Sequence, residues 1–225
     1  MGQAIGQALP FAVAIALSPI PIVGVVLMLS TPAGPREGIA FLSGWVLALA
    51  AGGTALLLLA SGGGASEAAG PAEWVSIFKI VLGMLLLGLA LRQWRARPPG
   101  DAEPELPGWM TAIDRFSPLK AAGMGVLLAV VNPKNLLLLL GGTAAIAQTG
   151  VSAGDQAVAL AVFIVIATIG VAAPLAIRFL MGDRAGKLLA GLHEWMAREN
   201  ATIMAVICLL IGVKLIGDGI SALSG

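Results

Sequence analysis

Charged residues are scarce in this chain. They make up 11% of its 225 residues, against about 25% in a typical soluble globular protein. The mean hydropathy is +0.96 and 58% of the residues are hydrophobic, which excludes a soluble domain of this size. The net charge of +1 provides no basic surface for nucleic acid, so we expect no nucleic-acid partner.

Side chains suited to catalysis are equally scarce. Cys208 is the only cysteine, which excludes an intrachain disulfide and a dithiol redox carrier. It lies in an apolar stretch, where we interpret it as a small buried hydrophobic residue. His193 is the only histidine and has no nucleophile near it. Because the sequence also lacks an acidic pair and a Gly-x-x-x-x-Gly-Lys-Ser/Thr pattern, we expect no enzyme, metal or cofactor.

Long apolar stretches dominate the sequence instead. Each is about 20 residues long, enough at 1.5 Å per residue to cross the roughly 30 Å hydrocarbon core of a bilayer. The first has no basic residue before it and is too long for a signal peptide, so we expect it to be retained as a membrane helix. The chain is thus predicted to be an all-α membrane protein with six transmembrane helices, at residues 8–30, 38–61, 73–94, 118–140, 156–180 and 200–221.

Basic residues are confined to one set of the predicted loops. The N-terminus, the tail and the loops at 62–72 and 141–155 contain no Lys or Arg. We expect a protein of the bacterial inner membrane. By the positive-inside rule, both termini lie outside and the basic loops lie in the cytoplasm. The basic positions on the cytoplasmic side are Arg36, Arg92, Arg95, Arg97, Arg115, Lys120, Arg178, Arg184, Lys187 and Arg198.

Two cytoplasmic segments are not predicted to span the membrane. Residues 97–107 are a Pro-rich acidic linker, which we expect to be extended. Apolar side chains then share one face in residues 109–116 and again in 184–197, a pattern typical of helices lying on the membrane surface. They are Trp109, Met110, Ile113, Phe116, Leu188, Leu189, Leu192, Trp195 and Met196. We therefore divide the chain into a first repeat (1–96), a linker with an interfacial helix (97–117) and a second repeat (118–225).

The two halves of the chain are weakly similar at a shift of 114 residues. Residues 18–21 (Ser-Pro-Ile-Pro) align with residues 132–135 (Asn-Pro-Lys-Asn), so a polar residue followed by proline interrupts the first and the fourth helix. Because each half has three spans, the halves form a 3+3 inverted repeat. Paired proline-interrupted segments in such repeats indicate the binding site of a transporter.

Each proline lacks an N–H group and so releases the carbonyl four residues before it. We expect free carbonyls at Ile15, Leu17 and Ala129, which must be satisfied by protein, water or substrate. The local candidates for this are Ser18, Asn132 and Asn135. The alternative is a pair of simple proline kinks closed by neighbouring helices.

Three lysines lie inside predicted spans, namely Lys79, Lys134 and Lys214. Lys214 has Asp218 four residues later, so a local ion pair is an alternative to a binding role. Lys79 is near the outer surface and has snorkelling as its alternative. If the three converge, they form a positive cavity for a phosphate, sulfate or carboxylate. The absence of carboxylates deep in the spans argues against a carboxylate proton relay and against export of divalent cations.

These motifs, with Lys79 in a helix that ends in residues 92–95 (Arg-Gln-Trp-Arg) and the glycines of 212–219, resemble the GAP/Sap group. This group comprises glycopeptidolipid- and sulfolipid-addressing proteins of actinobacteria within the LysE exporter superfamily. The resemblance spans nearly the whole chain and implies a six-helix inverted repeat that exports envelope glycolipids. It assigns the translocation site to Ser18, Pro19, Pro21, Asn132, Pro133, Lys134 and Asn135.

The sequence therefore favours an exporter or flippase that moves an anionic envelope lipid or similar amphiphile outward by alternating access. Two alternatives stay open: an exporter of a small solute such as an amino acid, and a scaffold for a lipid-secretion machine that carries no substrate itself. Membrane lipids are expected partners. The pattern Gly2-x-x-x-Gly6 is a weak indication of a homodimer.

Overall fold

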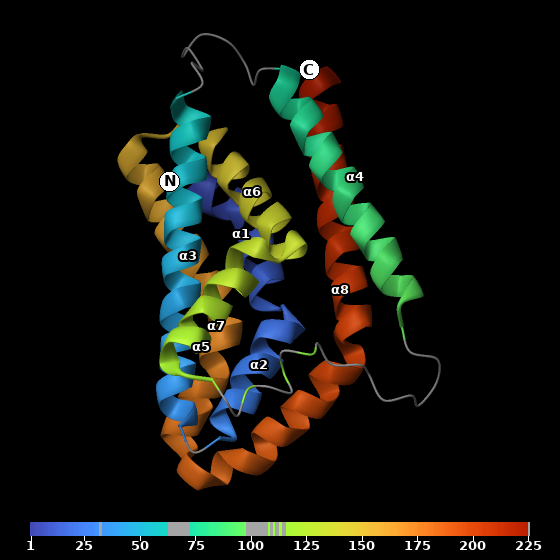
Figure 1. Ribbon diagram of the computed structural model, residues 1–225. Helices are drawn as coiled ribbons and strands as arrows, with labels where there is room; N and C mark the ends of the chain where they lie inside the picture. Colours follow the sequence, from blue (N-terminus) through green and yellow to red (C-terminus); the bar gives the residue numbers. More distant parts are fainter. Residues whose placement is uncertain are drawn as a thin grey trace.

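The computed structural model describes residues 1–31, 33–62, 73–97, 108, 110, 113 and 116–224. Its long elements are all helices, and no strand occurs among these residues. In chain order (Figure 1) they are α1 (Gly2–Ala16), α2 (Pro19–Leu29), α3 (Gly34–Gly62), α4 (Glu73–Arg95), α5 (Pro118–Val126), η2 (Leu127–Val131), α6 (Pro133–Ala147), α7 (Ala153–Met181), η3 (Gly182–Arg184) and α8 (Ala185–Ser224).

Membrane-spanning helices account for nearly all of this architecture. Four helices, α3, α4, α7 and α8, are each long and apolar enough to cross a bilayer. Two further spans arise if α1 with α2, and α5 with α6, each count as one helix that bends at a break. The bends are 48° and 61°, and they fall at the two predicted proline motifs. The expected all-α, membrane-embedded fold and both helix breaks are therefore present.

The second predicted interfacial helix is not a separate element. Residues 184–197 belong almost entirely to α8, which runs for 40 residues without a break from Ala185 to Ser224. Its first part crosses obliquely below the other helices (Figure 1). No glycine or proline separates this segment from the last span, so the helix continues into it, and the position of the segment on the membrane surface stays a prediction. Leu189 and Met196 are buried against the protein, whereas Leu188 and Trp195 are exposed.

The first predicted interfacial helix falls largely outside the described residues, Trp109 and most of the linker included. Met110 and Ile113 are described, and both are buried in the hydrophobic core. Phe116 packs against the same core. This apolar face therefore contacts the protein itself, where a surface helix would have turned it toward lipid.

Small residues allow the helices to approach closely. α1 packs on α7 and α3 packs on α5, while α4 lies along α8 beside the other helices (Figure 1). A Cβ atom on Gly170 of α7 would overlap the carbonyl oxygen of Ala16. Gly83 of α4 and Gly212 of α8 meet in the same way, each backbone against the other. Such small-residue contacts are typical of helix packing in membranes.

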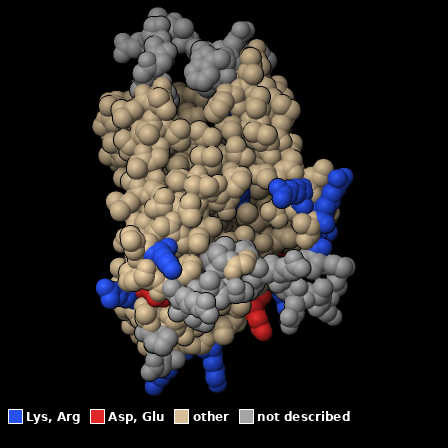
Figure 2. Space-filling model, in the orientation of Figure 1, with Lys and Arg blue, Asp and Glu red and all other residues tan. Residues whose placement is uncertain are grey.

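Most of the described basic side chains gather at one end of the molecule. On the face shown in Figure 2, Lys and Arg colour the lower part, and the upper part shows almost no charged side chain. The upper end in Figure 1 contains the C-terminus. This polarity agrees with the uneven distribution of basic loops along the sequence.

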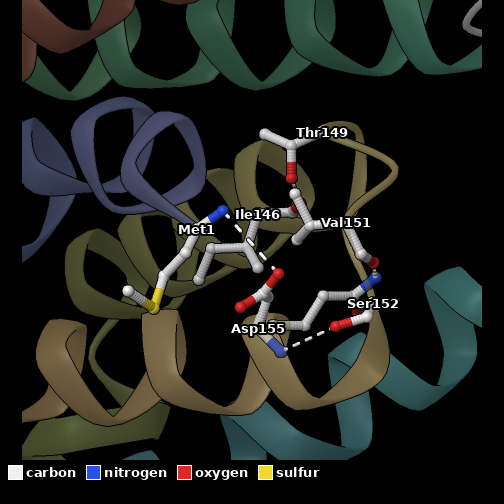
Figure 3. A network of polar contacts seen from close by, with 7 residues as sticks. Met1, Ile146, Thr149, Val151, Ser152 and Asp155 are labelled. Atoms are coloured by element: carbon white, nitrogen blue, oxygen red, sulfur yellow. Dashed lines mark hydrogen bonds and ion pairs between the residues drawn. The ribbon is translucent and has the colours of Figure 1, made fainter.

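Polar contacts lie at the neighbouring ends of α1, α6 and α7 (Figure 3), and one of them joins α1 to α7. The amino group of Met1 lies 3.9 Å from Asp155 Oδ2 in the first turn of α7. The Asp155 N–H donates to Ser152 Oγ at 3.2 Å, which caps that helix. Thr149 Oγ1 donates to the Ile146 carbonyl at 2.7 Å, after the end of α6. A Cβ atom added at Gly2 or Gly6 would meet no other helix within 4 Å, and the homodimer stays a prediction.

Candidate functional site

The first helix break lies between α1 and α2, at Ser18. Pro19 and Pro21 occupy the first turn of α2, where the N–H groups that proline lacks have no helical partner. The Ser18 N–H donates to the Ile15 carbonyl at 3.1 Å, which tightens the end of α1. The carbonyl of Ala14 thereby loses its usual donor. It accepts instead from Lys134 Nζ at 2.9 Å.

The second break lies at Asn132 and follows a wide π-helical turn, η2. The Asn132 N–H donates to the Leu127 carbonyl at 3.1 Å, five residues back. The carbonyl of Leu128 is thereby released, and it accepts from Asn135 Nδ2 at 2.8 Å. Asn132 Oδ1 in turn accepts from the Lys134 N–H at 3.1 Å and caps α6, with Pro133 as its first residue.

Two of the carbonyls that need partners, those of Ala14 and Leu128, were not among the ones we expected. Ala14 and Leu128 each lie one residue before an expected position, Ile15 or Ala129. The reason is that the residue before each proline does not bond to the carbonyl four residues back. The Ser18 N–H bonds to the carbonyl three residues back, and the Asn132 N–H bonds to the carbonyl five residues back. Ala14 and Leu128 are themselves 114 residues apart, so the two breaks release equivalent carbonyls.

The two breaks meet in one buried polar group, which we name the central cluster: Ser18, Lys134 and Asn135. Lys134 Nζ donates to Ser18 Oγ at 2.6 Å, and Ser18 Oγ donates to Asn135 Oδ1 at 2.9 Å. The exposed fractions are 2% for Ser18, 3% for Lys134 and 0% for Asn135. The structure thus joins residues from opposite halves of the chain that sequence analysis had assigned to one site.

Lys134 is the chemically unusual member of this cluster. An ammonium group has three N–H donors, and two of them are used by Ala14 and Ser18. Among the described residues no carboxylate pairs with it, and the titratable group within electrostatic range is the thiol of Cys208 on α8. A buried cation with neutral partners and one remaining donor is suited to binding an anionic group.

The other two lysines form a separate group, the upper cluster: Lys79, Lys214 and Asp218. Lys214 Nζ lies 2.5 Å from Asp218 Oδ2, so the expected local ion pair is present. Lys79 is within electrostatic range of both residues. Along α8, Lys214 is six residues beyond Cys208, or about 9 Å at the helical rise. Among the described residues no side-chain bond links Lys134 to this group, so the structure shows two lysine groups with different partners and different exposure.

Sequence analysis missed one buried carboxylate. Glu37 lies in the first turn of α3, is 3% exposed and accepts a hydrogen bond from Thr31 Oγ1 at 3.3 Å. The available signal was an acidic residue following a turn sequence, which is favourable at the positive end of a helix dipole. We had placed this residue in the loop before the second span, so its burial was not expected.

Two further features lie away from the central cluster. A depression of about 410 Å³ is lined by Gly88, Leu91, Arg92, Arg95 and Ala96, all at the lower end of α4. The described residues contain no group of three or more His, Cys, Asp and Glu side chains that would hold a metal ion.

Comparison with known proteins gives a single finding. A family model described as Sap, sulfolipid-1-addressing protein, matches residues 8–221, which includes both breaks and all three membrane lysines. No curated protein and no solved structure matches the chain. The match covers nearly the full sequence, so the chain belongs to the Sap, sulfolipid-1-addressing protein, family.

Proposed function

We propose that this protein is a transporter of the bacterial cytoplasmic membrane that moves an anionic envelope lipid or similar amphiphile outward. The observation that carries the proposal is the central cluster, where Lys134 bridges both helix breaks inside the protein. The lysine would bind the anionic headgroup through its remaining N–H donor. The proposal involves no enzymatic step and no cofactor.

The family supports the chemical class of the substrate. The family model is described as sulfolipid-1-addressing protein, and a sulfolipid is by its chemistry a lipid with a negatively charged sulfate or sulfonate group. Such a headgroup is complementary to a buried ammonium without a carboxylate partner. Helices long and apolar enough to cross a bilayer support a membrane-embedded carrier, whose lipid substrate would keep its tails in the surrounding bilayer.

We further propose that the two halves are related as an inverted repeat. Exchanging α1 with α5, α2 with α6, and α3 with α7 converts the contact of α1 with α7 into that of α5 with α3. It likewise converts the contact of α2 with α7 into that of α6 with α3. An inverted repeat with both breaks at its centre is the arrangement expected for alternating access around a fixed site.

One pair of helix contacts does not follow the symmetry of the inverted repeat, and it identifies which conformational state of the transport cycle the structure represents. α1 packs extensively on α6, whereas the equivalent pair, α2 and α5, makes little contact. With both termini outside, α1 and α6 are the outer half-helices, so the outer side is closed and the inner side is the looser one. In the alternate state α2 would pack on α5, and α1 would separate from α6.

The test is lipid movement by the purified protein in liposomes. Wild type should move a fluorescent anionic lipid between leaflets faster than a zwitterionic lipid with the same tails. Lys134→Met, which keeps the volume and removes the charge, should lose this movement. Lys120→Met is the matched control, because Lys120 is an exposed residue in the first turn of α5.

The outcomes separate the alternatives. Normal lipid movement by a well-folded Lys134→Met protein would contradict the role of Lys134. No lipid movement by folded wild type would contradict the lipid carrier itself. Amino-acid efflux from the same liposomes would then identify a solute exporter, and its absence would favour a scaffold of a secretion machine.

A further inference from the structure

The upper cluster has a defined position between α4 and α8. Gly83 packs against Gly212, and the Ser76 carbonyl lies against Gly219. The two residue numbers add up to the same value in both pairs. This is the pattern of facing residues on two antiparallel helices, where one number falls as the other rises. By this register Lys79 stands opposite Ile216, between the levels of Lys214 and Asp218. The glycine contacts therefore hold a lysine of α4 against an ion pair of α8.

The charges in this cluster do not balance. Two ammonium groups share one carboxylate, and Asp218 is already bonded to Lys214 at 2.5 Å. Lys79 is thus left with a surplus positive charge, and no hydrogen bond or ion pair of its side chain is found among the described residues. The Lys214 and Asp218 side chains are 33% and 41% exposed, so the cluster is accessible from outside the protein, unlike the central cluster.

An unpartnered hydroxyl lies next to this surplus charge. Ser76 is one helical turn before Lys79, on the same side of α4. Its side chain is 1% exposed, and its Oγ has no hydrogen-bond partner in the described structure. Leaving a buried hydroxyl unsatisfied costs about 1–3 kcal/mol, so such a group in a native protein calls for an explanation. A bound anion near Lys79 would provide the missing acceptor.

The cluster also reaches the helix that forms the first break. Lys214 Nζ lies 5.7 Å from the centre of the Phe11 ring in α1. A cation over an aromatic face is attracted to it. The upper cluster is therefore close to α1, on the side that closes against α6.

We propose that Lys79, Lys214 and Ser76 form a second anion site, separate from the central cluster, for a phosphate- or sulfate-type headgroup. Asp218 positions Lys214 and limits the net charge to one. The role of this site in releasing the substrate on the outer side rests on the proposed transport direction. Anion binding at Lys79 does not depend on that direction. An accessible site with a modest charge favours release, because a transported lipid must also leave.

The experiment measures binding to the purified protein in detergent by native mass spectrometry. The probes are short-chain phosphatidic acid, phosphatidylcholine of the same chain length and inorganic phosphate. We expect phosphatidic acid to bind at least tenfold more weakly to Lys79→Gln than to wild type. Asp218→Asn should bind it more tightly, because the competing carboxylate is removed. Lys120→Gln, at an exposed lysine of the opposite end, should bind as wild type does.

Weaker binding by Lys79→Gln together with tighter binding by Asp218→Asn supports the site. Misfolding alone would weaken binding in both variants and cannot explain tighter binding. Binding of inorganic phosphate with the same dependence would identify a free anion as the ligand; binding of phosphatidic acid alone would identify a lipid headgroup. Equal affinity of wild type, Lys79→Gln and Asp218→Asn would overturn the inference. Wild type that binds at Lys79 without moving lipid would retain this site and contradict only the proposed transport.

Discussion

The central and upper clusters show two different ways of placing lysine inside a membrane protein. Lys134 is closed off by protein and bonded to a carbonyl and a hydroxyl, with no carboxylate beside it. Lys214 remains a third exposed and has an aspartate one helical turn away. The first arrangement depends on helices that must break to supply its partners; the second requires only two helices in register. The comparison indicates that the central cluster is the one shaped by the fold as a whole.

The largest expected effect concerns the helix packing around the central cluster. In Gly170→Ala the new methyl group would overlap the Ala16 carbonyl at the end of α1, where neither backbone can easily move. We expect a loss of about 3 kcal/mol in the free energy of unfolding, near the upper end for overpacking. Thermal unfolding in detergent measures it.

Gly88→Ala is the control for this change, because no atom lies within 4 Å of the added methyl group. It should leave stability unchanged or raise it by up to about 1 kcal/mol through helix propensity. Equal stability of the two variants would show that the close approach of α7 to the first break is not required.

A smaller effect is expected from removing one polar partner in each cluster. Asn135→Leu leaves the Leu128 carbonyl without its side-chain donor and the Ser18 O–H without its acceptor, although Ser18 Oγ still accepts from Lys134. It should cost about 2 kcal/mol, because buried groups lose their hydrogen bonds. Asp218→Asn should cost about 0.5 kcal/mol, since partly exposed ion pairs contribute little. Unfolding curves with similar midpoints for both variants would contradict the claim that the polar contacts of the central cluster contribute more to stability than those of the upper cluster.

Sequence reasoning located the breaks but not the way they are closed. Pro19 and Pro133 each follow a polar residue, and this pattern predicted both breaks, whereas Pro174 follows an alanine and lies inside the unbroken α7. The carbonyls that are released depend on whether each turn tightens or widens, and this is set by packing against α7 and α3. The bond from Lys134 to Ser18 joins residues 116 positions apart, and it depends on how α1 crosses α6.

Within the membrane helices, charge patterns predicted contacts only between residues close in the sequence. The spacing of Lys214 and Asp218 by four residues predicted their ion pair, because one helical turn fixes their distance. The position of Lys79 beside that pair depends on the glycine-mediated register of α4 with α8, which no local pattern contains. The continuation of residues 184–197 into the last span was missed for a related reason: amphipathicity indicates a face, but it does not show whether the helix continues.

The most direct test of the central claim is the accessibility of Ser18 during transport. Cys208 is the only cysteine, so Cys208→Ala provides a cysteine-free background for Ser18→Cys. In the structure this side chain is 2% exposed, and a carrier must open the site to water in each cycle. In liposomes where the variant moves anionic lipid, a small membrane-impermeant thiol reagent should label position 18 and arrest transport. A variant that keeps moving lipid with position 18 unlabelled would contradict a translocation site where the two broken helices meet.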